Sequence, residues 1–471
     1  MAGFIGRKRE LASLNRLLST AAAGGRLGRP GRAILMRGRR RVGKSRLAEE
    51  FVARSGLPHL FFAANTRPTR MQLQRFQEVA RRSTLPGADL FDVVTPDSWE
   101  AALRLLVDAL PQDSPSVVVI DELPFLISGD PSLEGTLQEL FDREFSRRPV
   151  LLLLIGSDLS MMEAINQYDR PFYLRATDML IHPLTPADVG ELLDLGAPEA
   201  FDAHLISGGF PHICEEWPVG ASLWEYLERS VPDPISALAV SGERSLAAEF
   251  PPEAQARDVL SVIGAGQRTF SSISRATGGM PQASLSRALR VLLEKRMIVS
   301  EAPLSGKPSR EHRYHVADPH LRFWLPFIEP YLPEIERGRG DLVVERIRRS
   351  WPSWRGMAVE PVIRESLRRM DGLPEGTGAI GGYWTRTNDP EIDIVGADRE
   401  PVARRITMAG SIKWLENRPF DQHDLSELVV RRAKLPGADS STPLYAVSRS
   451  GCVVEGVSHV TPGDLIDAWR G

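Results

Sequence analysis

The chain has 471 residues, a length that suggests about three domains. Its composition, 42% hydrophobic and 25% charged, is that of a globular protein. A net charge of −3 excludes an overall positive electrostatic potential that would attract nucleic acid. Two cysteines exclude a disulfide framework and a thiolate metal site. The N-terminal stretch lacks a signal-peptide core and no apolar run approaches the roughly 18 residues of a membrane span, so we expect a cytoplasmic protein without a membrane partner.

The predicted elements divide the chain into five segments. Apolar strands alternate with helices over residues 1–182, the pattern of an α/β fold with a parallel sheet. Residues 183–248 are predicted to be helical, and residues 249–318 give three helices followed by two short strands. A helical, aromatic connector over 319–350 precedes a mixed helix-and-strand domain over 351–471.

A phosphate-binding loop is predicted between the apolar run "AILM" and a helix. The stretch "GRRRVGKS" fits the pattern G-x4-G-K-[ST] in the required context. Its glycines let backbone N–H groups surround phosphates, Lys44 would reach the β and γ phosphates, and Ser45 would ligate Mg²⁺. A basic turn that contains glycine is the alternative. The residues expected to bind ATP here are Gly38, Arg39, Arg40, Arg41, Val42, Gly43, Lys44, Ser45 and Arg46.

Two later apolar runs end in polar residues that would complete this P-loop site. "SVVVI" ends at Asp121 and Glu122, which would hold Mg²⁺ through water and polarise the attacking water, unless they form a helix cap. "VLLLLIG" ends at Ser157, either a sensor of the γ phosphate or a turn residue. Of two nearby arginines, Arg170 and Arg175, we select Arg175 to reach the phosphates of its own chain or of a neighbour. The expected catalytic residues are Lys44, Glu122, Ser157 and Arg175.

Six motifs occur in an order that resembles the archaeal-type AAA ATPase family related to STAND ATPases. They are FIGRKREL, GRRRVGKS, VVVIDEL, IGSDLSMM, PFYLR and SGGFPHI. The resemblance covers most of the chain and implies a helical lid and a C-terminal domain similar to restriction-type nucleases. It also implies that Ile5, Gly6 and Arg7 contact the base or ribose, and that Gly209 and Pro211 belong to the lid motif.

The element order over 249–318 is that of a winged helix-turn-helix. From Arg268 to Arg313, nine Lys/Arg stand against three Asp/Glu, a local charge of +6 (9 − 3). Such a surface suits contacts with DNA phosphates. A winged helix that docks on protein, with its arginines solvated, is the alternative. The candidates for DNA contact are Arg287, Arg290, Lys307, Arg310 and Arg313.

The nuclease-like resemblance implies a helical glutamate, an aspartate on one strand and a Glu-x-Lys motif on the next. Glu360 and Asp393 fit the first two positions, with Glu391 two residues before the aspartate. Ser411, however, stands two residues before Lys413, where the pattern has a carboxylate. Because Mg²⁺ prefers carboxylate ligands, we predict a degenerate nuclease fold. A working nuclease and an unrelated α/β domain are the alternatives.

Together these features predict an ATP-binding and ATP-hydrolysing protein of AAA/STAND type. ATP and Mg²⁺ are the expected cofactors, and the nucleotide state would be coupled to a DNA-contacting winged helix and to the C-terminal domain. The alternatives are an ATP-dependent DNA nuclease and a DNA loader similar to replication initiators. A protein partner or a homo-oligomer is compatible with each of these functions.

Overall fold

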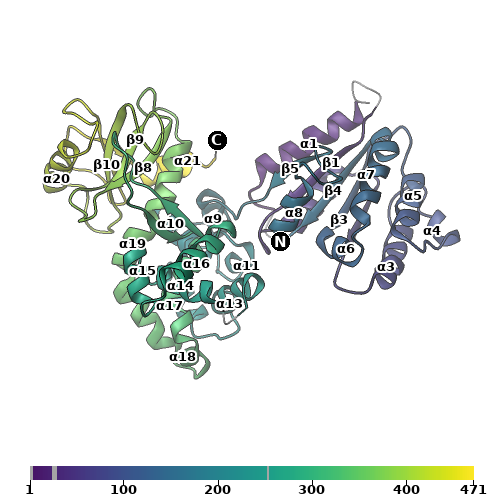
Figure 1. Ribbon diagram of the computed structural model, residues 1–471, viewed down its shortest axis with the longest axis horizontal. Coiled ribbons are helices and arrows are strands. Elements are labelled where there is room, and N and C mark those ends of the chain that lie inside the picture. The colour runs from purple at the N-terminus through teal and green to yellow at the C-terminus, as the bar shows by residue number, and fades with distance from the viewer. Residues whose placement is uncertain (1–3, 24–28, 252–253, 471) are drawn as a thin grey trace. The chain divides into compact units, whose positions relative to one another are not determined.

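The computed structural model describes residues 4–23, 29–251 and 254–470. The chain forms two compact units, Met1–Pro183 and Leu184–Gly471, which are described separately (Figure 1). The boundary between them lies one residue after the end of the predicted core segment. Among the described residues, no helix has the length and apolarity that crossing a membrane requires.

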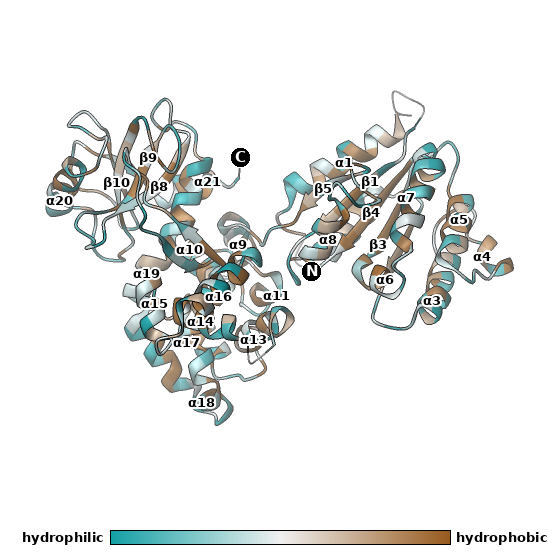
Figure 2. Cartoon of the chain, in the orientation of Figure 1, coloured by the Kyte–Doolittle hydropathy of each residue, from teal (hydrophilic) through white to brown (hydrophobic). Residues whose placement is uncertain are grey.

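The first unit is built on a five-stranded parallel sheet with strand order β2-β3-β4-β1-β5. The strands are β1 (Arg32–Arg37), β2 (His59–Ala63), β3 (Ser116–Asp121), β4 (Val150–Gly156) and β5 (Ala176–Leu180). Every residue of β3 and β4 is buried, and Figure 2 shows these strands among the hydrophobic segments. Helices on both faces of the sheet explain why these strands read as unbroken apolar runs.

Helices cover the two faces of this sheet. One face packs against α1 (Lys8–Ala22) and α2 (Lys44–Ser55). The other face forms a hydrophobic cluster with helices that include α3, α5, α6 and α7. The remaining helices of the unit are α3 (Thr69–Arg81), α4 (Leu90–Val93), α5 (Trp99–Ala109), α6 (Leu123–Gly129), α7 (Leu133–Arg143), η1 (Phe145–Arg147) and α8 (Leu159–Ile165).

The strand order determines which residues meet at the carboxyl edge of the sheet. β4 lies between β1 and β3, and the three strands run parallel. The loop after β1, the residues after β4 and the acidic pair at the end of β3 therefore share one edge. Ligands bind at this edge in open α/β sheets.

The second unit begins with helices α9 (Pro186–Leu193), α10 (Ala197–Ser207), α11 (Pro211–Cys214), α12 (Leu223–Ser230) and α13 (Ala237–Glu249). α10 ends at Ser207 with Gly208 as its C-cap, and Gly209 follows with φ 69°. A Cβ on Gly209 would lie 2.0 Å from the carbonyl oxygen of Leu184. The double glycine therefore permits a sharp turn and a close backbone approach.

Three helices and a two-stranded antiparallel sheet follow. They are α14 (Gln255–Gly264), α15 (Phe270–Ala276), α16 (Gln282–Glu294), β6 (Ile298–Glu301) and β7 (Arg313–Val316). The loop between the strands packs on the C-terminal domain, because the N–H of Leu304 donates to the carbonyl of Gly382 at 2.8 Å and that of Gly306 to Pro436 at 2.7 Å. Protein contacts therefore hold the hairpin loop of this three-helix module, and a winged helix stays a prediction.

A long helix joins this module to the last domain. α17 (Pro319–Phe327), η2 (Glu329–Tyr331) and α18 (Leu332–Glu336) precede α19 (Gly340–Arg369), a helix of 30 residues. The predicted boundary between residues 350 and 351 falls inside α19. Pro352 and Pro361 also lie within the helix, where each removes a backbone hydrogen bond. Tertiary packing compensates, since Trp351 and Ile363 are buried.

The C-terminal domain holds a mixed five-stranded sheet of order β12-β11-β10-β9-β8. β8, β9 and β10 are antiparallel, and β10, β11 and β12 are parallel. Its elements are β8 (Ala379–Trp384), β9 (Glu391–Ala397), β10 (Ile406–Lys413), α20 (Gln422–Ala433), β11 (Leu444–Ser448), β12 (Ser458–Val460) and α21 (Pro462–Asp467). The predicted α/β class is confirmed, with a P-loop-type parallel sheet and a second mixed-sheet domain.

Candidate functional site: a P-loop nucleotide site

The P-loop connects β1 to the N-terminus of α2. Its backbone is left-handed at Arg41 (φ 66°) and at Gly43 (φ 92°), which turns successive N–H groups toward a common point. Lys44 is buried, and its Nζ donates to the carbonyls of Gly38 at 2.9 Å and Arg39 at 3.0 Å. Burial lowers the pKa of Lys44, although the nearby Glu122 opposes the effect. The ammonium thus lies inside the loop, where phosphates would be held.

Ser45 and Asp121 form the second part of the site. The hydroxyl of Ser45 donates to Oδ2 of Asp121 at 2.6 Å, across 76 residues of sequence. Asp121 is buried, and this burial raises the pKa of its carboxyl, although the hydrogen bond from Ser45 opposes the rise. A hydroxyl beside a carboxylate is an oxygen donor set that fits Mg²⁺.

Glu122 is held in an unusual conformation at the start of α6. Its φ is 54°, a left-handed value that costs energy for a residue with a side chain. Both carboxylate oxygens accept hydrogen bonds from the hydroxyl of Ser157 at 2.8 Å. β4 carries Ser157 beside β3, so the strand order creates this contact. The serine therefore orients the predicted catalytic glutamate.

The two candidate arginines after α8 make ion pairs with α7. Arg175 pairs with Asp142 at 2.8 Å and also donates to the carbonyls of Pro171 and Tyr173. Arg170 pairs with Glu134. Contact of Arg175 with a phosphate stays a prediction, and it requires these interactions to break.

The opening motif contacts the P-loop directly. Arg7 is buried, with φ 60°, and donates to the carbonyl of Val42 at 2.7 Å and to Glu10 at 3.2 Å. Ile5 and Gly6 precede it, so the motif lies beside the nucleotide loop. Gly209 and Pro211, in contrast, belong to the second unit, where they form the turn into α11.

The candidates for DNA contact divide into two groups. Arg287 and Arg290 are exposed on α16, and Lys307 and Arg310 are exposed in the wing loop. Arg313 instead donates to Glu391 at 2.6 Å and to Asn388 at 2.8 Å, and it stacks on Trp384. Its guanidinium joins β7 to the C-terminal domain.

The nuclease-like residues lie near one another, and arginines pair with two of their carboxylates, those of Glu360 and Glu391. Ser411 donates to Oδ2 of Asp393 at 2.9 Å. Arg364 pairs with Glu360 at 2.8 Å, and Lys413 pairs with Asp424 at 2.8 Å. Among the described residues, no cluster of three or more His, Cys, Asp or Glu could hold a metal ion. Glu360, Asp393 and Lys413 are present, and Ser411 stands where the pattern has a carboxylate.

Sequence reasoning missed the arginines that organise these sites. Arg37, at the end of β1, pairs with Glu163 at 2.5 Å and Asp178 at 2.8 Å and so ties α8 and β5 to the P-loop strand. Arg364 was also missed, although its position four residues after Glu360 is an ion-pair spacing on a helix. No local pattern indicated Arg37.

Comparison with known proteins supports the predicted resemblance. Residues 324–425 match a family described as archaeal and bacterial proteins of unknown function. The chain is also 26% identical over 452 residues to "Uncharacterized protein MJECL04" of Methanocaldococcus jannaschii, which covers 94% of this chain and 95% of that protein. The predicted similarity to archaeal and bacterial proteins with a C-terminal domain of unknown function is confirmed.

Similar solved structures include a Walker-type ATPase of Pyrococcus abyssi, with 20% identity and a TM-score of 0.48 over 68% of this chain and 96% of that one. The ORC2 protein of Aeropyrum pernix matches with 14% identity and a TM-score of 0.44 over 74% of this chain and 97% of its own. Both scores lie below 0.5, and the P-loop NTPase fold of the first unit rests on its own strand order and loop.

Proposed function

We propose that the protein is an ATPase that binds ATP with Mg²⁺ in the P-loop of the first unit and hydrolyses it. The observation that carries this proposal is the joint placement of Lys44, the Ser45–Asp121 pair and the Ser157–Glu122 pair at one edge of the sheet. A basic turn alone would explain the loop but not the two acid–serine pairs on neighbouring strands.

Each group has a role that follows from its position. Backbone N–H groups and Lys44 would bind the phosphates, and Ser45 and Asp121 would hold Mg²⁺. When bound, the metal ion would neutralise part of the negative charge of the phosphates. Glu122 accepts a proton from water or orients it, and Ser157 fixes the carboxylate of Glu122 for that task.

A substitution at Glu122 tests hydrolysis separately from binding. Glu122→Gln should leave ATP affinity nearly unchanged and reduce turnover by roughly 10²–10⁴-fold, the usual contribution of a general base. Glu100→Gln, on an exposed part of α5, is the matched control. Equal turnover in the wild type and Glu122→Gln would remove the glutamate from the mechanism.

DNA contact through α16 is a second proposal, favoured by the exposure of Arg287 and Arg290 within the basic module. The wing is less suited to DNA than the sequence suggested, because Leu304 and Gly306 fix it to the C-terminal domain. We therefore place the contact on α16 and omit Arg313, whose guanidinium is paired with Glu391.

Salt dependence distinguishes this contact from protein docking. Arg287→Ala with Arg290→Ala should weaken duplex DNA binding and reduce the salt slope by about one unit for each lost phosphate contact. Replacement of Arg337 and Arg339, exposed after α18, removes the same charge elsewhere. Equal weakening by both pairs would indicate only net charge, and an unchanged affinity would favour docking on protein.

The alternative functions receive unequal support. A nuclease requires a metal site, and the ion pair of Arg364 with Glu360 argues against one. A DNA loader similar to replication initiators is compatible with the P-loop unit and the three-helix module. Measuring whether ATP changes DNA affinity without cutting separates the two alternatives.

A further inference from the structure

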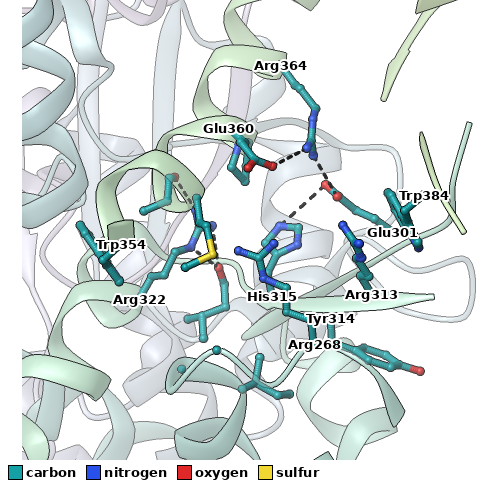
Figure 3. Close-up of a pocket in the computed structure, with 17 residues that line it drawn as sticks. Arg268, Glu301, Arg313, Tyr314, His315, Arg322, Trp354, Glu360, Arg364 and Trp384 are labelled. Carbon is teal, nitrogen blue, oxygen red and sulfur yellow. Dashed lines mark hydrogen bonds and ion pairs between the residues drawn. The ribbon is translucent and has the colours of Figure 1, made fainter. Parts of the chain in front are cut away.

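The second unit contains a cavity of about 70 Å³ that none of the proposed functions uses. It lies between the β6–β7 hairpin, α17, α19 and β8, and Figure 3 shows the charged side chains that line it. Four arginines and two glutamates contribute to the lining, and Glu391 beside it pairs with Arg313, which gives a local charge of +1 (4 − 3) when the lining His315 is neutral. Burial, Arg322 and Arg364 lower the pKa of His315 well below its ordinary value, so the imidazole is neutral near pH 7.

Two of the four arginines are paired with carboxylates. Arg364 donates to Glu301 at 3.1 Å and to Glu360 at 2.8 Å. Arg313 pairs with Glu391 at 2.6 Å. These two guanidinium charges are therefore neutralised by direct contacts.

The other two arginines, Arg268 and Arg322, are not neutralised in this way. Within the described chain, the hydrogen bonds of Arg322 go to the carbonyls of Val316 and Ala358. In the same ranges, the guanidinium of Arg268 donates no hydrogen bond and forms no ion pair, although its backbone carbonyl is fixed by the N–H of Tyr314 at 2.7 Å. Figure 3 shows both arginines around His315 at the cavity.

The pKa of Arg322 indicates that the positive charges of Arg268 and Arg322 repel each other at the cavity. Burial, followed by the like charge of Arg268, lowers the pKa of Arg322 to about 10, although Glu301, Asp318 and Glu360 oppose the fall. Two guanidinium groups that repel each other in a part-buried cavity are stabilised when an anion lies between them. Arginine is also the side chain whose planar fork best matches phosphate oxygens.

We propose that this cavity binds a phosphomonoester dianion between Arg268 and Arg322. A volume of about 70 Å³ admits a few water molecules or one phosphate group, and it excludes a whole nucleotide. A phosphate group offers three acceptor oxygens to the two guanidinium groups, whereas a carboxylate offers two. The phosphate belongs either to a small molecule or to the 5′ end of a nucleic acid strand. This site is independent of the P-loop.

The test uses the full chain with Lys44→Ala, so that the P-loop contributes less to phosphate binding. Inorganic phosphate is titrated by calorimetry at constant ionic strength. Arg268→Gln should weaken saturable binding by about 10-fold or more, because it removes a charged hydrogen-bond donor. Arg275→Gln, exposed on α15 of the same module, should change the affinity by less than about twofold. Arg268→Lys should restore part of the binding.

Several outcomes would overturn the proposal. They are the absence of saturable phosphate binding, equal weakening by Arg268→Gln and Arg275→Gln, and unchanged binding in Arg268→Gln. The guanidinium of Arg268 donates no hydrogen bond in the described chain, so Arg268→Gln should still fold, and a folded variant with unchanged affinity is decisive.

A second set of ligands identifies the source of the phosphate. A 5′-phosphorylated trinucleotide that binds more tightly than inorganic phosphate, with loss in Arg268→Gln, would support a nucleic acid end. Equal affinities for the two would support a small phosphomonoester. A 5′-hydroxyl trinucleotide that binds as well as the phosphorylated one, and equally in Arg268→Gln, would contradict a terminal-phosphate site.

Discussion

The two units each contain a serine that donates to an aspartate, with a lysine close by in sequence, yet the side chains around the two pairs differ. In the first unit, Ser45 donates to Asp121 at 2.6 Å. In the C-terminal domain, Ser411 donates to Asp393 at 2.9 Å. The residue types are the same, so residue type alone does not decide whether a site can hold a cation.

The difference lies in what the basic side chains contact. Lys44 donates to backbone carbonyls of the P-loop. Lys413 pairs with the buried Asp424, and Arg364 pairs with Glu360 while it donates to the carbonyl of Asp393. A carboxylate with a fixed cation beside it has little remaining attraction for a metal ion. The comparison teaches that the neighbours of a motif, and not the motif alone, determine its chemistry.

The largest effect is expected when the two lysines are exchanged for alanine one at a time. Lys44→Ala should weaken ATP binding by roughly 100-fold, since each hydrogen bond to a charged group contributes about 1.5–3 kcal/mol. Lys413→Ala should leave ATP affinity within about twofold of the wild type, because its ion pair lies in the other unit. Calorimetric titration with ATP measures both. Similar losses of ATP affinity in the two variants would contradict the different roles given to the two lysines.

A pH dependence follows from Glu360. Burial raises the pKa of this carboxyl from 4.5 to about 7; Arg364 and Arg268 oppose the rise, and Asp393 and Glu391 add to it. Because the folded pKa is the higher one, this contribution to stability is present below pH 4.5 and is lost as the pH rises toward 7. Glu301 and the neutral His315 also line this cavity.

We therefore expect Glu360→Gln to flatten the fall in unfolding free energy between about pH 4.5 and 7. The difference from the wild type should reach at most about 3.5 kcal/mol, from roughly 1.4 kcal/mol for each pKa unit. Urea unfolding at several pH values measures it, and Glu375→Gln, on the exposed surface, is the control. Parallel pH curves for wild type and Glu360→Gln would contradict the assignment.

Ser157→Ala should have a smaller effect on the first unit than Lys44→Ala. Loss of the hydrogen bonds to Glu122 should reduce kcat by about 10-fold, the effect of about 1.4 kcal/mol, with little change in KM. Ser157→Thr keeps the hydroxyl and should restore much of the rate. Steady-state kinetics separates these cases, and an increase in KM alone would indicate that Ser157 contacts ATP and does not position Glu122.

Local patterns predicted the P-loop because its residues are contiguous and follow a recognisable strand. They did not predict that Ser157 contacts Glu122, which requires β4 to lie beside β3. They also missed the ion pairs of Arg364 with Glu301 and of Arg313 with Glu391, whose partners lie 63 and 78 residues apart in the sequence. These pairs arise when the hairpin of the three-helix module packs on the C-terminal domain, an event with no signature in sequence spacing.

The smallest expected effect is a gain of metal binding in the C-terminal domain. Ser411→Glu adds the carboxylate that the sequence lacks, but Arg364 would still occupy Glu360. Combining Ser411→Glu with Arg364→Gln should remove this obstacle and create a weak Mn²⁺ site with Asp393. At a concentration equal to its Kd, Mn²⁺ would stabilise the folded protein by about 0.4 kcal/mol.

Thermal unfolding with and without Mn²⁺ measures this gain against the wild type, which corrects for any cation held by Ser45 and Asp121. Ser411→Glu with Arg368→Gln is the matched control, since Arg368 lies four residues further along α19 and pairs with Glu365. Further replacement of Asp393 by alanine should abolish the stabilisation. If Ser411→Glu alone gains as much as the double variant, the missing carboxylate is the sole defect and Arg364 does not block the site. If only the double variant responds, the arginine is what separates this domain from a metal-binding one.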